Sequence, residues 1–115
     1  MRRGDIRLVD FEPARGSEAD KRRPAVIVSN DRANATAIAL GRGTITVVPV
    51  TSNVTKVYPF QTLLPASRTQ LAVDSKAQSE QVRSVSVDRL GPALGRVPPD
   101  LMAELDDALR LHLAL

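Results

Sequence analysis

Three consecutive cations, Lys21, Arg22 and Arg23, stand directly before Pro24 and the apolar run 25–28. The short, β-branched run predicts a strand that is buried on both faces. Pro24 has no backbone N–H, which suits the first residue of a strand, and it biases Arg23 towards an extended backbone. The pattern therefore predicts an arginine fixed at the start of a core strand, ready to bind an anion. On these residues alone, a solvated run of charges remains the alternative.

The residue sets used by most enzymes are missing. The chain has no cysteine and a single histidine, His112. Disulfides, thiolate metal sites and a two-histidine acid–base mechanism within one chain are therefore excluded. The sequence also lacks a cluster with metal-ligand spacing and a glycine-rich phosphate loop. We expect no metal and no cofactor, and we expect His112 to have a packing or surface role.

The remaining arginine, threonine, serine and carboxylate groups suffice for one reaction, the attack of an RNA 2′-hydroxyl on its own adjacent phosphate. That substrate carries its nucleophile, so the protein need only orient it and stabilise the developing charge. A guanidinium can donate to two phosphate oxygens at once, and a threonine hydroxyl can donate a hydrogen bond to a further phosphate oxygen. Arginine is a poor base, so the group that accepts the 2′-proton is not identified. Glu18 is a candidate base, with a solvated loop carboxylate as the alternative.

The 115 residues are expected to form one domain, 1–115, with 43% hydrophobic residues and a net charge of +3. The pI near 10.0 mildly favours an anionic partner such as nucleic acid. Only two Phe and one Tyr are available for base stacking. No apolar run approaches a membrane span and no signal peptide is visible, so a cytoplasmic location is the default expectation.

The pattern of apolar and turn residues predicts many short strands. Residues 11–22 are predicted to form a surface loop, whose length indicates a function. Pro49 predicts an edge strand or a bulge that would aim Thr51 and Ser52 into a site. Residues 30–43 fit either a short helix or an irregular connection, with a turn at Gly41 and Gly43. The predicted strands are 5–10, 24–29, 44–51, 60–64, 75–78, 80–85 and a short one at 94–97, with a loop at 67–72 and a turn at Gly91, Pro92 and Gly95.

One clear helix is predicted at the C-terminus. Pro98 and Pro99 suit its first turn, and the carboxylate of Asp100 suits its positive N-terminal dipole. Several short strands followed by one packed helix predict a small, mostly antiparallel barrel. One stripe at helical spacing holds Leu101, Leu105, Ala108, Leu109 and His112, with Met102 and Leu113 beside it.

A series of short motifs runs in order along nearly the whole chain. The pieces are Gly4-Asp5-Ile6, Val9-Asp10-Phe11, Pro13, Gly16-Ser17-Glu18, Arg22 to Ser29, Val48-Pro49-Val50-Thr51-Ser52, Tyr58-Pro59-Phe60, Gln81 to Val85, and Arg89-Leu90. Each piece is weak alone, but in their order and spacing they resemble the MazF/PemK/Kid family of toxin endoribonucleases from bacterial toxin–antitoxin pairs. The chain departs from the family at Leu8, where relatives often have an aromatic residue.

The resemblance implies an SH3-like antiparallel barrel of the CcdB/PemK type with a C-terminal α-helix. It also implies a homodimer that cuts single-stranded RNA at a short sequence without a metal, leaving 2′,3′-cyclic phosphate and 5′-hydroxyl ends. A cognate antitoxin with an acidic C-terminal tail would neutralise it. By the same resemblance Arg23 and Thr51 are the catalytic residues. The expected RNA-binding residues are Glu18, Lys21, Arg22, Ser52, Asn53 and Arg83.

Two other functions stay open on the sequence. A gyrase poison of the CcdB type is said to share this barrel and needs no arginine–threonine site. A plain RNA-binding barrel fits the basic pI equally well. Cleavage of naked RNA by the purified protein distinguishes both from a nuclease.

Overall fold

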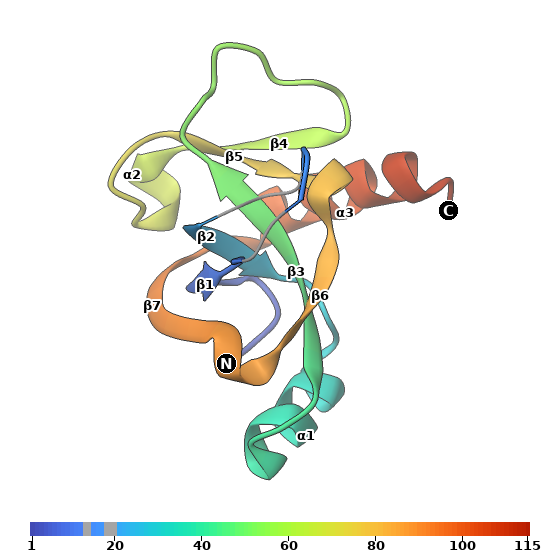
Figure 1. Cartoon of the computed structure of the whole chain (residues 1–115). Coiled ribbons are helices and arrows are strands. Elements are labelled where there is room, and N and C mark those ends of the chain that lie inside the picture. Colours follow the sequence, from blue (N-terminus) through green and yellow to red (C-terminus); the bar gives the residue numbers. More distant parts are fainter. Residues whose placement is uncertain (13–14, 18–20) are drawn as a thin grey trace.

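The computed structural model describes residues 1–12, 15–17 and 21–115 (Figure 1). The strands are β1 (Asp5–Asp10), β2 (Arg22–Ile27), β3 (Thr44–Thr51), β4 (Gln61–Leu64), β5 (Ser75–Gln78), β6 (Arg83–Ser86) and β7 (Leu90–Arg96). The helices are α1 (Asp31–Leu40), α2 (Ala66–Thr69) and α3 (Pro99–Leu113), with 3₁₀ turns η1 (Ser79–Gln81) and η2 (Val87–Arg89). The molecule is thus mostly antiparallel β with a C-terminal helix, as predicted. Within the described ranges no helix is long and apolar enough to cross a membrane.

Strand β3 is the central strand and pairs with β2, β5 and β6. The sheet runs in the order β4-β5-β3-β2-β1-β7, with β6 outside this path. In Figure 1 strand β3 extends from α1 at one end of the molecule to the loop before β4 at the other. Its first part pairs with β2 and β6, and its last residues pair with β5. One strand therefore belongs to two curved halves of the sheet, which is how a short chain closes a barrel-like core.

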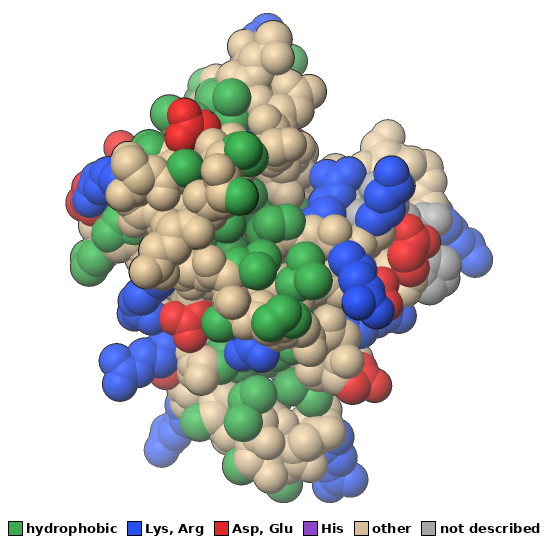
Figure 2. Space-filling view, turned by 90° about the vertical axis from the view of Figure 1, so that its left-hand side faces the viewer, with side chains coloured by type: hydrophobic (Ala, Val, Ile, Leu, Met, Phe, Trp, Pro, Cys, Tyr) green, Lys and Arg blue, Asp and Glu red, His purple; other side chains and the backbone are tan. Residues whose placement is uncertain are grey.

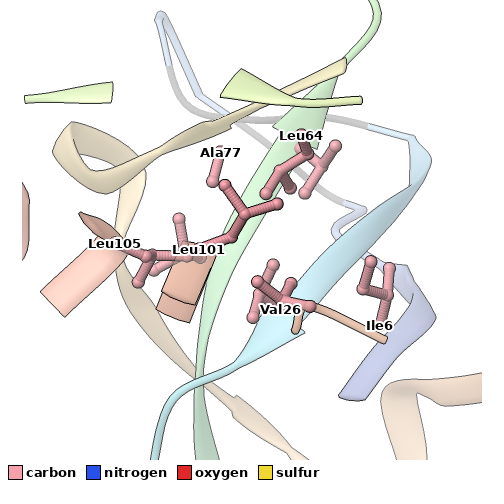
Figure 3. Packing of buried hydrophobic residues seen from close by; sticks show 9 residues of the cluster. Ile6, Val26, Leu64, Ala77, Leu101 and Leu105 are labelled. Carbon is pink, nitrogen blue, oxygen red and sulfur yellow. The ribbon is translucent and has the colours of Figure 1, made fainter. Parts of the chain in front are cut away.

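The continuous apolar run of β2 is buried on both faces, as predicted. Successive side chains of a strand point to opposite faces. Val26 accordingly packs in a cluster with β3, β4 and α3 (Figure 3). Ala25 and Ile27 pack in a second cluster with Val47 and with Ala37 of α1. The two clusters lie on opposite sides of the central strands and together bury them.

Helix α3 packs through its first three turns only. Leu101, Leu105 and Ala108 are buried, whereas His112 and Leu113 at the end of the predicted stripe are exposed. The predicted stripe is therefore too long by about one turn. The His112 ring lies 6.4 Å from that of Phe60, centroid to centroid, so His112 occupies a surface position.

The segment 30–43 is a helix followed by a turn. The Asn30 side chain accepts a hydrogen bond from the Ala33 N–H and so caps the start of α1. Gly41 at φ 63° and Gly43 at φ 106° make the predicted turn, in backbone conformations that favour glycine. Of the two structures that fitted this segment, the helix is observed.

The loop predicted at 67–72 is wrong, because Ala66–Thr69 forms helix α2. Two side chains hold this single turn. The Asp74 carboxylate accepts from the Ala66 N–H at 2.8 Å, and the Thr69 hydroxyl donates to the Pro65 carbonyl at 2.9 Å. Arg68 donates twice to Asp100 of α3 and lowers the pKa of that carboxyl. The first two contacts are local, and only the contact between Arg68 and Asp100 joins segments distant in sequence.

The turn predicted at Gly91, Pro92 and Gly95 is also wrong, since these residues lie within β7, which pairs with β1. The ladder between β1 and β7 contains register shifts, which absorb the proline. Gly95 is required for a close approach rather than a turn. A Cβ added there would lie 2.0 Å from the Thr69 carbonyl oxygen.

Pro49 causes neither an edge nor a break. It is buried within β3 and lies opposite Ala25 of β2. On the other side of β3, the pairing with β6 ends at Val47 and the pairing with β5 begins at Val50. A proline is tolerated where a ladder changes partners in this way. Other predicted bounds shift slightly: β2 begins at Arg22 rather than Pro24, and 80–85 divides into η1 and β6.

Candidate active site

Arg23 and Thr51 are brought together by the register of β2 and β3. Ala25 pairs with Pro49 in this antiparallel ladder. Arg23 lies two residues before Ala25 in β2, and Thr51 lies two residues after Pro49 in β3. When the register is continued to these residues, Arg23 stands opposite Thr51 on the same face of the sheet. Both side chains line one cavity of about 490 Å³. Two residues 28 positions apart in the sequence therefore line a common cavity.

The cavity has an apolar wall and a polar rim. Ser52 lines it beside Thr51, as predicted for a residue near the site. On the face that carries α2 and β7, hydrophobic side chains gather at the centre with Lys and Arg side chains beside them (Figure 2). A pocket of this kind can seat a base against its apolar part and a phosphate against Arg23. The remaining lining residues are Pro24, Val50, Gln70, Leu71, Ala72, Val73, Ser75 and Leu94.

The backbone on both sides of Arg23 is held in place. Arg23 is half-buried and pairs with Val9 of β1. Lys21, two residues earlier, has φ 62°, and its N–H donates to the Glu12 carboxylate at 2.7 Å. The Lys21 carbonyl accepts from the Phe11 N–H at 2.9 Å. These contacts hold the backbone that leads into β2 and to Arg23.

The Thr51 hydroxyl is oriented by the turn that follows it. Its oxygen accepts a hydrogen bond from the Asn53 N–H at 3.2 Å. The Asn53 side-chain oxygen in turn accepts from the Thr55 N–H at 3.3 Å. A hydroxyl that accepts one hydrogen bond still has a proton to donate. Thr51 can therefore donate into the cavity, while Asn53 shapes the turn and does not line the cavity.

Arg22 does not line this cavity, although the next two residues of β2, Arg23 and Pro24, both do. It lies opposite Asp10 in the β1–β2 ladder. With Glu12, Asp88 and Arg89 it lines a second cavity of about 600 Å³. Arg22 and Arg23, which the sequence predicts in one RNA site, therefore line two different cavities.

Arg83 and Lys21 also do not line the arginine–threonine cavity. The Arg83 guanidinium lies 5.5 Å from the centre of the Phe11 ring, on the side of the second apolar cluster. Lys21 is exposed at the end of the loop. Glu18, the candidate base, lies outside the described residues. In the part of the chain that is described, no group of three or more His, Asp or Glu side chains is placed to hold a metal ion.

The lining residues 70–73, Ser75 and Leu94 were not expected at the site. They come from the segment after α2, from the start of β5 and from β7, and β7 lies against the end of α2 where Gly95 meets the Thr69 carbonyl. No local pattern marks them. Only the motif at Arg23 and the residues after Pro49 carried a signal in the sequence.

Comparison with known proteins gives a consistent result. The family described as "PemK-like, MazF-like toxin of type II toxin-antitoxin system" matches residues 2–113. Endoribonuclease MazF9 of Mycobacterium tuberculosis (strain ATCC 25618 / H37Rv) is 65% identical over 115 residues, covering 100% of this chain and 98% of that protein. The crystal structure of MazF (Form-I) from Deinococcus radiodurans superposes with a TM-score of 0.82 at 30% identity, covering 100% of this chain and 97% of that one. The MazE–MazF (Form-II) structure from the same organism gives 0.74 at 27% identity, with 100% and 96% covered.

The antiparallel fold and the family match along residues 2–113 define the class, and the chain belongs to the PemK-like, MazF-like toxin family of type II toxin–antitoxin systems. Identity of 65% along its whole length places it with the MazF-type endoribonucleases. This membership favours the nuclease over the gyrase poison and over a barrel that binds RNA without cutting it.

Proposed function

We propose that this protein is a sequence-specific, metal-independent endoribonuclease toxin that cuts single-stranded RNA. The observation that carries the proposal is that Arg23 and Thr51, at the neighbouring ends of β2 and β3, line one cavity. Arg23 supplies a planar cation for two phosphate oxygens, and Thr51 supplies a hydroxyl donor. Both act on a substrate that carries its own nucleophile.

The reaction is an internal transesterification. The 2′-oxygen attacks phosphorus, a new P–O2′ bond forms and the P–O5′ bond breaks. The 2′-hydroxyl loses a proton and the departing 5′-oxygen gains one, so the products are a 2′,3′-cyclic phosphate and a 5′-hydroxyl. Arg23 and Thr51 stabilise the extra negative charge on the phosphorane, as fixed donors do at an oxyanion site. The group that removes the 2′-proton is left unassigned.

We propose as partners a second copy of the chain and a cognate antitoxin with an acidic C-terminal tail. Support for the antitoxin comes from the MazE–MazF structure, which shares this fold over the full chain. The basic pI of about 10.0 favours both an acidic tail and RNA. A cytoplasmic location is the natural one for a toxin that acts on RNA.

End mapping of a long single-stranded RNA in excess EDTA tests the reaction. We expect cuts at one short sequence, with cyclic phosphate on the upstream fragment and a 5′-hydroxyl on the downstream one. These ends follow because the nucleophile is the RNA's own 2′-oxygen. An RNA with a 2′-deoxy residue at the cut position is the control and must resist cleavage. Loss of activity in EDTA with recovery on adding Mg²⁺, or 5′-phosphate ends, would contradict the mechanism.

A further inference from the structure

Lys76 of β5 is a buried lysine beside the proposed active site. It is 7% exposed and lies directly opposite Thr51 in the ladder between β3 and β5. Residues directly opposite each other in an antiparallel pair have their side chains on one face. Lys76 therefore continues the row that Arg23 and Thr51 begin, one strand further across the sheet.

Burial of a cation is costly unless the ammonium is well bonded, so its partners identify what it does. The Lys76 ammonium donates to the backbone carbonyl of Lys56 and lies 5.9 Å from the centre of the Tyr58 ring. Both partners belong to the loop 52–60, which projects from the end of β3 before β4 (Figure 1). Lys76 thus ties this loop to the sheet.

The loop that Lys76 holds is the one that orients the Thr51 hydroxyl. Asn53 donates its N–H to the Thr51 oxygen at 3.2 Å, and Thr55 donates to the Asn53 side chain at 3.3 Å. The next residue, Lys56, carries the carbonyl that Lys76 binds. Thr51 and Lys76 are therefore connected twice, once through the hydrogen bonds of the loop and once directly across the β3–β5 ladder.

We propose that Lys76 is a positioning residue for RNA cleavage. By fastening Lys56, it keeps the turn at Asn53 in the shape that bonds the Thr51 oxygen and directs its proton towards the substrate phosphate. Without that anchor the exposed turn relaxes, and the hydroxyl samples other rotamers. Misplacement of a reacting group by about 1 Å can lower a rate about 100-fold. This inference rests on the proposed role of Thr51.

A double-mutant cycle tests the coupling. Lys76→Met keeps the length of the side chain and removes its donors, and we combine it with Thr51→Val. Single-turnover cleavage and KM are measured for all four proteins on one RNA. We expect Lys76→Met alone to lower the rate about 10- to 100-fold with little change in KM. In the Thr51→Val background it should cost no more than about twofold, because the hydroxyl that it positions is already absent.

Further variants separate positioning from charge and from folding. Lys76→Arg keeps charge and donors and should restore most of the rate. Arg110→Met, which removes one positive charge from the exposed end of α3, is the matched control and should leave the rate unchanged. The Asn53 amide should exchange with solvent faster in Lys76→Met than in the natural protein. If Lys76→Met fails to fold, Lys76→Gln, which keeps a neutral donor, takes its place in the cycle.

The outcomes distinguish this inference from the proposed function. A full rate in Lys76→Met, or an equal loss in both backgrounds, would overturn the positioning role while Thr51 kept its own. Unchanged cleavage in Thr51→Val would instead remove the proposed function of Thr51, and this inference with it. A raised KM at constant kcat would mean that Lys76 acts on RNA binding, which also contradicts positioning.

Discussion

At the scale of single residues, two arginines that are adjacent in sequence line two different cavities. Arg22 and Arg23 are neighbours in sequence, yet Arg22 faces Asp10 and a second cavity, whereas Arg23 shares a cavity with Thr51. The fold, rather than the charge run, decides which cation lines the proposed active site. Substitutions at these two positions should therefore have different consequences.

Removal of the Arg23 guanidinium should reduce cleavage far more than it reduces stability. Arg23→Ala is expected to lower the rate about 10²–10³-fold, as is typical when one fixed donor to a developing charge is lost. Arg23→Lys should recover only part of the rate, because an ammonium cannot make two parallel contacts. Arg22→Ala, at the second cavity, is the matched control and should retain most activity per folded molecule. Wild-type rates in a folded Arg23→Ala protein would remove Arg23 from the active site.

Replacement of Thr51 by valine keeps its shape and removes its hydroxyl. A hydrogen bond to a charged group is worth about 1.5–3 kcal/mol, so the rate should fall about 10- to 100-fold. The melting temperature should stay near that of the natural protein, since Thr51 is only half-buried. Cleavage kinetics and thermal unfolding on the same samples make this comparison. A large drop in stability with unchanged cleavage would indicate a purely structural role.

At the scale of elements, the contact between α2 and β7 builds the cavity wall. Gly95 of β7 approaches the Thr69 carbonyl so closely that a Cβ would lie 2.0 Å from that oxygen. The segment 70–73, which follows α2, lines the cavity together with Leu94. The shape of the cavity therefore depends on a glycine that does not itself line it.

Gly95→Ala should force this contact apart. Overpacking of this kind costs about 1–3 kcal/mol or more, because backbone cannot move aside as a flexible side chain can. We expect a lower melting temperature and weaker RNA binding. Gly41→Ala is the control: its Cβ meets open space at φ 63°, so only backbone strain of about 1 kcal/mol is added. Equal losses of stability in the two variants would contradict the close-approach argument.

At the scale of the molecule, the last turn of α3 leaves large apolar side chains uncovered. Leu111, Leu113 and Leu115 are all exposed, as is Leu63 of β4. A small barrel cannot cover this surface by itself, and two-fold dimers are the commonest solution. Light scattering at micromolar concentration should give about twice the chain mass of 12.4 kDa. A clean monomer mass would contradict the proposed homodimer.

The basic surface should make antitoxin binding sensitive to salt. An acidic, partly disordered tail that folds along the RNA site would compete with RNA for the same cations. Its affinity should fall as salt rises, because exposed charges are screened beyond about 8 Å at physiological ionic strength. Titration calorimetry at two salt concentrations measures this, with a tail whose carboxylates are replaced by amides as the control. A bound tail that leaves RNA cleavage intact would contradict the competition.

The sequence by itself determined the local features of this protein. The apolar run after Pro24, strand 75–78, the turn at Gly41 and Gly43 and the proline start of α3 follow from nearest neighbours and periodicity, and all are observed. The arginine–proline motif and the residues after Pro49 also identified the proposed catalytic pair. These signals are local because the backbone preference of a residue depends on its nearest neighbours, and the pattern of buried and exposed side chains repeats within a few residues.

Tertiary structure alone decided how the site is enclosed. The sequence predicted Gly95 as a turn residue, but in the structure it lies in β7 and lets this strand pack closely against the end of α2. Pro49 predicted an edge strand or a bulge, although β3 continues through it and changes its pairing partner from β6 to β5. Lys76 carried no signal at all until the ladder placed it opposite Thr51. Each of these depends on contacts between segments distant in sequence, and strand pairing and close packing set such contacts only when the whole chain has folded.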